Sequence, residues 1–146
     1  MGYVGKVLEI LIVEDNPGDI RIIQESFKEM GLPNILRVVK NGVEALQYLR
    51  RQGRYAEAQA PDLIILDWNM PMKNGREVLL DIKSDPALKR IPVVVLTSSE
   101  ADDDIFQAYD LHANCCVTKP GNLDEFIKVV HAIESYWSGI AKLPPA

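Results

Sequence analysis

Short apolar segments alternate with amphipathic segments along this chain, and this alternation constrains the fold more than any other feature of the sequence. The apolar segments predict β-strands at residues 7–13, 34–39, 62–66, 92–96 and 114–117. The segments between them carry apolar residues at helical spacing and predict helices at residues 19–30, 42–52, 76–85, 100–112 and 122–143. Strands that alternate with helices imply right-handed crossovers and a parallel sheet with helices on both faces.

The predicted fold class is therefore α/β, of the flavodoxin-like, doubly wound (βα)5 type. We expect a five-stranded parallel sheet in the order 2-1-3-4-5. The uninterrupted apolarity of residues 62–66 predicts a strand that is buried on both faces. With 146 residues the chain is too short for a TIM barrel, which needs about 250. We expect a single domain over residues 1–146 with an extended C-terminal helix, and a loop at residues 53–61.

The last predicted helix carries a long apolar stripe. The stripe consists of Leu123, Phe126, Val130, Ile133, Trp137 and Ile140. We expect these residues to cover the core. The alternative is that the apolar residues near the end of the helix, together with Tyr136 and Leu143, leave a patch for a homodimer contact.

Composition and charge exclude several classes of protein. The net charge of −5 and the lack of basic runs argue against nucleic-acid binding. No apolar stretch approaches the roughly 20 residues of a membrane span. The apolar N-terminal run stops at two acids, unlike a signal peptide, so we expect a cytoplasmic protein. The adjacent Cys115 and Cys116 would point to opposite sides of a strand and are expected to be free thiols.

Four of the five predicted strands end at polar residues of particular kinds. Glu14 and Asp15 follow the first strand, Asp67 the third, Thr97 the fourth and Lys119 the fifth. In open α/β sheets the site lies at the carboxyl ends of the strands, where the strand order reverses. In the order 2-1-3-4-5 this point lies between the first and third strands. Asp15 and Asp67 are therefore expected to face each other.

These residue types together predict phosphoryl-transfer chemistry. Converging carboxylates repel one another, and a divalent cation with oxygen ligands, such as Mg2+, relieves the repulsion. Lys119 and Thr97 would supply a positive charge and a hydroxyl donor to a phosphoryl group. Asp67 would then be the nucleophile and would form an aspartyl-phosphate. Taken singly, each residue has an ordinary explanation as a turn former, helix cap or surface charge, and only their joint placement favours a site.

The residues at these strand ends resemble a known family. The segments "ILIVEDNPGD", "LIILDWNMPMKNG", "VVVLTSS" and "VTKP" are similar to the receiver domain of two-component response regulators, over about residues 8–137. The resemblance implies that Asp67 is the phosphoacceptor and that Asp15 and Asp67 bind Mg2+. It further implies that the backbone carbonyl of Asn69 is the third protein ligand and that Glu14 acts through water.

The same resemblance implies how the switch works and which proteins it meets. Thr97 would be the switch hydroxyl, and Lys119 would pair with the phosphoryl group. A sensor histidine kinase would donate the phosphoryl group, and a downstream protein target would bind the fourth and fifth helices. Such a domain is not an enzyme in the usual sense, because it catalyses only its own phosphorylation and dephosphorylation.

Two further segments narrow the resemblance, and one residue departs from it. The tail "IESYWSGIAKLPP" and the loop "RRQGRYAEAQAPDL" are similar to stand-alone response regulators paired with bacterial phytochromes, best known in cyanobacteria. This similarity implies a phytochrome-like kinase as the partner. Most receivers carry an aromatic residue or a histidine three residues before the lysine, but here that position is Cys116.

Two other functions compete with this interpretation. The first is a phosphorylation-independent pseudo-receiver that only binds partners. Its usual mark is a missing acid or lysine, and none is missing here. The second is an aspartyl-phosphate phosphatase, which usually carries a second acid two residues after the nucleophile. Asn69 occupies that position and counts against it.

Overall fold

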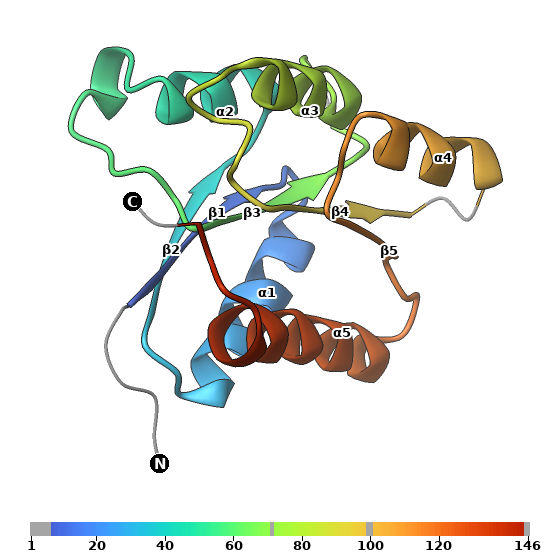
Figure 1. Ribbon diagram of the computed structural model, residues 1–146. Coiled ribbons are helices and arrows are strands. Elements are labelled where there is room, and N and C mark those ends of the chain that lie inside the picture. The colour runs from blue at the N-terminus through green and yellow to red at the C-terminus, as the bar shows by residue number, and fades with distance from the viewer. Residues whose placement is uncertain (1–6, 71, 99–100, 145–146) are drawn as a thin grey trace.

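The protein folds around a five-stranded parallel sheet (Figure 1). The computed structural model describes residues 7–70, 72–98 and 101–144. The strands are β1 (Leu8–Val13), β2 (Asn34–Val39), β3 (Leu63–Asp67), β4 (Val93–Thr97) and β5 (Cys115–Thr118). Their order is β2-β1-β3-β4-β5, which confirms the predicted fold class and strand order.

Helices cover both faces of the sheet (Figure 1). They are α1 (Pro17–Met30), α2 (Gly42–Leu49), α3 (Gly75–Ser84), α4 (Asp102–Asp110) and α5 (Leu123–Ser135). The helices α1 and α5 lie on one face, and α2, α3 and α4 lie on the other. A short 3-10 helix (Gly53–Tyr55) interrupts the predicted loop at 53–61. In the described part of the chain, no helix is long and apolar enough to cross a membrane.

The inner strands divide the core into two layers. Along β1, Leu11 and Val13 pack toward α2 and α3, whereas Ile10 and Ile12 pack toward α1 and α5. This alternation follows from the two-residue period of a strand. Every residue of β3 is buried, as its unbroken apolarity predicts. The core therefore extends to the last residue of β3, which is Asp67.

The final helix, predicted over residues 122–143, extends to Ile140, but its last part is not α-helical. The α-helix ends at Ser135 and continues as a π-helical turn, Tyr136–Ile140. In this turn the hydroxyl of Ser138 donates to the carbonyl of Glu134, and a side chain that takes a helical carbonyl loosens the regular ladder.

The predicted apolar stripe on this helix is buried only in its middle part. Phe126, Val130 and Ile133 are buried, whereas Leu123 and Ile140 at the two ends are 58% and 71% exposed. Coverage of the core thus accounts for the centre of the stripe. The homodimer contact remains a prediction for its exposed end.

Asparagine caps fix where four of the five helices begin. The side chains of Asn16, Asn41, Asn74 and Asn122 each accept a hydrogen bond from the backbone N–H three residues later. At α3 the contact is reciprocal, because the side chain of Glu77 also accepts the N–H of Asn74. These caps fix the loops at the carboxyl edge of the sheet, where the polar strand ends lie.

Gly75 lies at the closest approach of two backbone segments near this edge. A Cβ atom at this position would lie 2.5 Å from the carbonyl oxygen of Asp67 and 2.7 Å from the Cα of Trp68. Both atoms belong to the backbone and have no side-chain freedom to move aside. Only glycine therefore allows α3 to start against the end of β3.

We predict that Gly75→Ala lowers the free energy of unfolding by about 1–3 kcal/mol, because the methyl group must displace the end of β3. Gly121→Ala is the matched control, since a Cβ at that position meets nothing within 4 Å. Urea denaturation of both variants beside the wild type measures the difference. Equal stability of the two variants would contradict the close approach at Gly75.

Glu134 is an acid buried between α5 and the start of β2. Its side chain has no exposed surface, and its Oε2 accepts a hydrogen bond of 3.2 Å from Nδ2 of Asn34. Its Oε1 has no hydrogen-bond partner among the described residues. Burial raises the pKa of Glu134 to about 7, although the hydrogen bond from Asn34 opposes the rise.

Between pH 4.5, the usual pKa of a glutamate, and about pH 7, Glu134 stays protonated in the folded protein but ionises in the unfolded chain. Its contribution is therefore favourable at low pH and is lost as the pH rises toward about 7. We predict that, as the pH rises from roughly 4.5 to 7.5, the free energy of unfolding of Glu134→Gln increases relative to that of the wild type by up to about 3 kcal/mol. Thermal and urea unfolding across this range test it, with the exposed Glu29→Gln as control. Parallel pH profiles for wild type and Glu134→Gln would refute the prediction.

Candidate functional site

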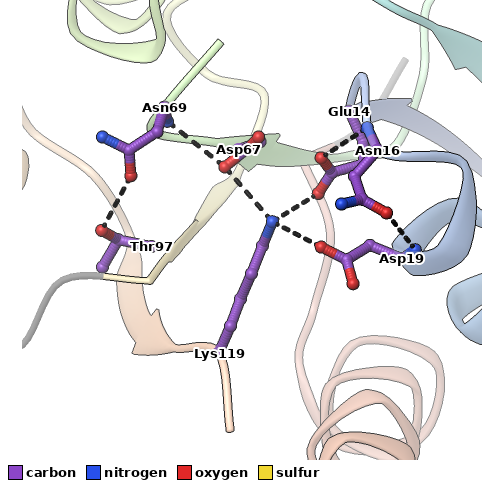
Figure 2. A network of polar contacts seen from close by, with 7 residues as sticks. All are labelled: Glu14, Asn16, Asp19, Asp67, Asn69, Thr97 and Lys119. Atoms are coloured by element: carbon purple, nitrogen blue, oxygen red, sulfur yellow. Dashed lines mark hydrogen bonds and ion pairs between the residues drawn. The ribbon is translucent and has the colours of Figure 1, made fainter. Parts of the chain in front are cut away.

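Strand register brings the polar strand ends together. Val13 of β1 pairs with Leu66 of β3, so the residues that follow, Glu14 and Asp67, lie side by side. On the other side of β3, Thr97 at the end of β4 pairs with Thr118, which places Lys119 one residue beyond it. The structure thus gathers the predicted site residues at one edge of the sheet, as Figure 2 shows for most of them.

The acids form a compact group at this edge. Glu14, Asp15 and Asp67 each offer a carboxylate oxygen, and these oxygens lie within 4.8 Å of one another. Glu14 is 1% exposed and Asp67 is 4% exposed, so water screens their charges poorly. The predicted convergence of Asp15 and Asp67 across the reversal of strand order is present.

Crowding and burial perturb the ionisation of Asp67. Burial raises the pKa of Asp67 to about 7, and the hydrogen bond and charge of Glu14 add to the rise. The positive charge of Lys119 and the backbone N–H of Asn69 act in the opposite direction. The ionised form of Asp67 is therefore energetically unfavourable in this position, and a bound cation would remove the penalty.

Lys119 is surrounded by carboxylates (Figure 2). Its Nζ lies 2.8 Å from Oε1 of Glu14, 2.9 Å from Oδ2 of Asp19 and 3.4 Å from Oδ1 of Asp67. Burial lowers the pKa of Lys119, but the hydrogen bonds to Glu14 and Asp19 and the nearby charges outweigh burial and raise it above its usual value. Lys119 is therefore a permanent positive charge beside Asp67.

Asn69 and Thr97 complete the surroundings of Asp67. The backbone N–H of Asn69 donates to Oδ1 of Asp67 at 3.2 Å. The hydroxyl of the buried Thr97 donates to Oδ1 of Asn69 at 3.5 Å (Figure 2). Asn69 therefore links the predicted switch hydroxyl to the predicted phosphoacceptor. Its carbonyl as a metal ligand remains a prediction.

Asp19 and Asn16 belong to this network, although the sequence analysis did not include them. Asn16 caps α1, and its Oδ1 accepts the backbone N–H of Asp19 at 3.0 Å. The N–H of Asn16 donates to Oε2 of Glu14 at 3.2 Å. The spacing of an asparagine three residues before an acid, directly after a strand, is a signal that could have identified the cap and with it the position of Asp19.

A cavity of about 460 Å³ lies next to Asp67. It is lined by Trp68, Asn69, Met70, Asn74, Arg76 and Asp104. The lining includes the two residues that follow Asp67 in the chain, so the cavity lies beside the acidic group. Trp68 is buried beside it and can report on binding by fluorescence. Pro71 of the predicted motif lies outside the described residues.

Cys116 lies where most receivers carry an aromatic residue, and its neighbour on the surface is Tyr109. The N–H of Cys116 donates to the hydroxyl of Tyr109 on α4 at 3.2 Å. Cys115 and Cys116 are free thiols and pack against opposite faces of the sheet, as predicted. Burial raises the pKa of both thiols, which is the opposite of what a reactive thiolate requires.

The donor set fits a hard divalent cation. Three carboxylates and a nearby amide carbonyl are oxygen ligands of the kind that Mg2+ and Mn2+ prefer. The single lysine at the centre does not balance the four surrounding acids Glu14, Asp15, Asp19 and Asp67. A cation held by the crowded acids would offset this excess of negative charge.

The fold and this edge of the sheet define a receiver domain. The family model for the response regulator receiver domain matches residues 10–131. The chain belongs to this family, and it is a response regulator receiver of the two-component type.

Its relatives include response regulators of cyanobacteria. The chain is 47% identical to the response regulator Rcp1 of Synechocystis sp. over 94% of its own length and 93% of that protein. It superposes on the crystal structure of the phosphorylated cyanobacterial phytochrome response regulator RcpA with a TM-score of 0.93 and 52% identity, covering 96% of this chain and 100% of that one. The Mn2+-bound form of Rcp1 gives a TM-score of 0.91 and 46% identity, with 94% and 99% covered.

The crowding of acids predicts that removal of one charge stabilises the metal-free protein. We expect Asp67→Asn to raise the free energy of unfolding by about 1–2 kcal/mol in buffer with a chelator, because an isosteric neutral group relieves the repulsion. Thermal unfolding measures the change, and Glu57→Gln in an exposed loop controls for net charge. An unchanged or lower Tm for Asp67→Asn would show that the acids do not repel one another significantly.

Proposed function

We propose that this protein is a phosphorelay response regulator whose phosphoacceptor is Asp67. The observation that carries the proposal is the position of Asp67. It ends the central strand β3, with the acids Glu14 and Asp15 beside it, Thr97 at the end of the neighbouring strand β4, and the ammonium group of Lys119 3.4 Å from its carboxylate. Each neighbour supplies one of the charges or donors that phosphoryl transfer requires.

The proposed reaction transfers a phosphoryl group from a phosphohistidine. A carboxylate oxygen of Asp67 attacks the phosphorus atom, the phosphorus–nitrogen bond breaks, and its electron pair stays on the imidazole, which then takes up a proton. Lys119 Nζ contributes positive charge to the phosphoryl oxygens, and the hydroxyl of Thr97 contributes a hydrogen bond. Water later attacks the same phosphorus atom, the bond from phosphorus to the Asp67 oxygen breaks, and inorganic phosphate and a proton leave. This step restores the Asp67 carboxylate, so that the domain acts only on itself.

A divalent cation is part of the proposed site. Glu14, Asp15, Asp67 and the carbonyl of Asn69 would hold Mg2+, with Glu14 acting through water. The cation would supply charge neutralisation to the transferred group. The relative Rcp1 has been solved with Mn2+ bound, which supports a cation of this class here.

The proposed output is a changed surface for protein partners. Thr97 ends β4, which leads toward α4, and a shift of its hydroxyl toward the phosphoryl group would alter how α4 lies on the sheet. Phe106 and Tyr109 on α4 and Leu123 on α5 are large, exposed side chains that a downstream protein could cover.

The proposed phosphodonor is a sensor histidine kinase of the phytochrome type. The supporting observation is the likeness to the phytochrome response regulator RcpA over the whole length of that chain. The likeness to Rcp1 extends over 94% of this chain and 93% of that protein. No feature of the described residues indicates a light-absorbing group in this chain itself.

Intact-mass spectrometry tests the proposed function. After incubation with Mg2+ and acetyl phosphate we expect a single phosphoryl adduct on the wild type. We expect none with Asp67→Asn and none when a chelator removes Mg2+. Asp110→Asn, an exposed acid on α4, should behave like the wild type.

The same measurement extends to the partner. An autophosphorylated phytochrome-type histidine kinase replaces acetyl phosphate, and transfer to the wild type but not to Asp67→Asn supports the proposed pairing. If acetyl phosphate leaves the wild type unmodified and Mg2+ leaves Trp68 fluorescence unchanged, the proposal fails, and a constitutive binding module becomes the better account.

A further inference from the structure

Lys119 lies closer to two other acids than to the proposed phosphoacceptor. The distances from Nζ are 2.8 Å to Glu14 and 2.9 Å to Asp19, against 3.4 Å to Asp67. A lysine ammonium group has three N–H donors. In this structure two of them form hydrogen bonds with Glu14 and Asp19, and Asp67 has only a longer ion-pair contact. Figure 2 shows these three contacts spreading from one nitrogen.

Asp19 is held in place by the start of α1. It lies in the first turn of that helix, and its backbone N–H is bound by the cap residue Asn16. The same Asn16 donates its N–H to Glu14, so both acids that bind Lys119 are fixed by one residue. The loop from β1 to α1 therefore forms a rigid acidic anchor on one side of the lysine.

The side chains of this anchor are partly shielded from water. The side chain of Lys119 is 12% exposed and that of Asp19 is 23% exposed. Partial burial makes an ion pair stronger than on an open surface. Loss of the contact between Lys119 and Asp19 therefore costs more than loss of a fully exposed ion pair.

We propose that Asp19 is a positioning residue that competes with the phosphoryl group for Lys119. In the unphosphorylated protein Asp19 draws the ammonium group toward α1 and away from Asp67. A phosphoryl group on Asp67 adds negatively charged oxygens that must displace Asp19 as the partner of the ammonium group. Asp19 therefore destabilises the phosphorylated state relative to the unphosphorylated state, and so affects how much of the protein carries the phosphoryl group. This inference rests on the proposed function.

The test uses beryllium fluoride with Mg2+ as a probe for the phosphoryl group, followed by Trp68 fluorescence on the full chain. Asp19→Asn removes the charge of the anchor but keeps its shape. We expect the variant to bind the probe roughly three- to tenfold more tightly than the wild type. Glu25→Gln makes the same change of charge on an exposed part of α1 and should leave the affinity unchanged.

A double variant separates positioning of Lys119 from a simple effect of charge. In the background of Lys119→Met, Asp19→Asn should no longer change the affinity for the probe, because Asp19 acts through the ammonium group. A gain of the same size in that background would overturn the proposal and show that Asp19 acts only by its negative charge. Far-UV circular dichroism checks that each variant keeps its helices, and Asp19→Ser provides a second substitution.

The outcomes distinguish this inference from the function on which it rests. If the wild type neither binds beryllium fluoride nor accepts a phosphoryl group from acetyl phosphate, the proposed function fails. If the wild type does both, and Asp19→Asn binds the probe as tightly as the wild type or less tightly, only the role of Asp19 is overturned.

Discussion

The chemistry of the carboxyl edge of the sheet depends on the crowding of negative charge beside Lys119. The adjacent strands β1 and β3 force Glu14 and Asp67 together, and burial prevents the two acids from separating into solvent. Lys119 offsets part of this charge. The helices that follow these strands also start at this edge, and their positive N-terminal ends favour negative charge. The carboxylates of the site therefore repel one another, and binding of a cation would relieve this repulsion.

The strand order and the gathering of the acids could be predicted from the sequence. An unbroken apolar segment that is too short for a helix of ordinary length predicts a strand that is buried on both faces. In a parallel sheet the residues after such strands lie at one edge. The ends of the helices were less predictable. The second helix stops at Leu49 rather than at residue 52. Arg51 adopts a positive φ of 55°, and the N–H of Gln52 then bonds to the carbonyl of Gln47 as in a C-terminal helix cap. The π-helical turn after Ser135 likewise has no simple sequence signal.

In the candidate site, too, the sequence predicts which residues come together but not their exact distances. The convergence of Asp15 and Asp67 follows from topology, and so does the position of Lys119 directly after the fifth strand. The preference of Lys119 for Glu14 and Asp19 over Asp67 is a matter of tenths of an ångström. The spacing of Asn16 and Asp19 indicates the cap that orients the first turn of α1, but it does not specify the distances from Lys119 to the individual acids.

The hydroxyl of Tyr109 over the edge strand has a consequence for association between molecules. β5 is short and lies at the border of the sheet, where unpaired N–H groups can recruit a strand from another chain. The hydroxyl of Tyr109 accepts the N–H of Cys116 in this strand. A side chain on α4 is thus bonded to the backbone of the border strand, so another chain that pairs along this border meets a contact that moves with α4.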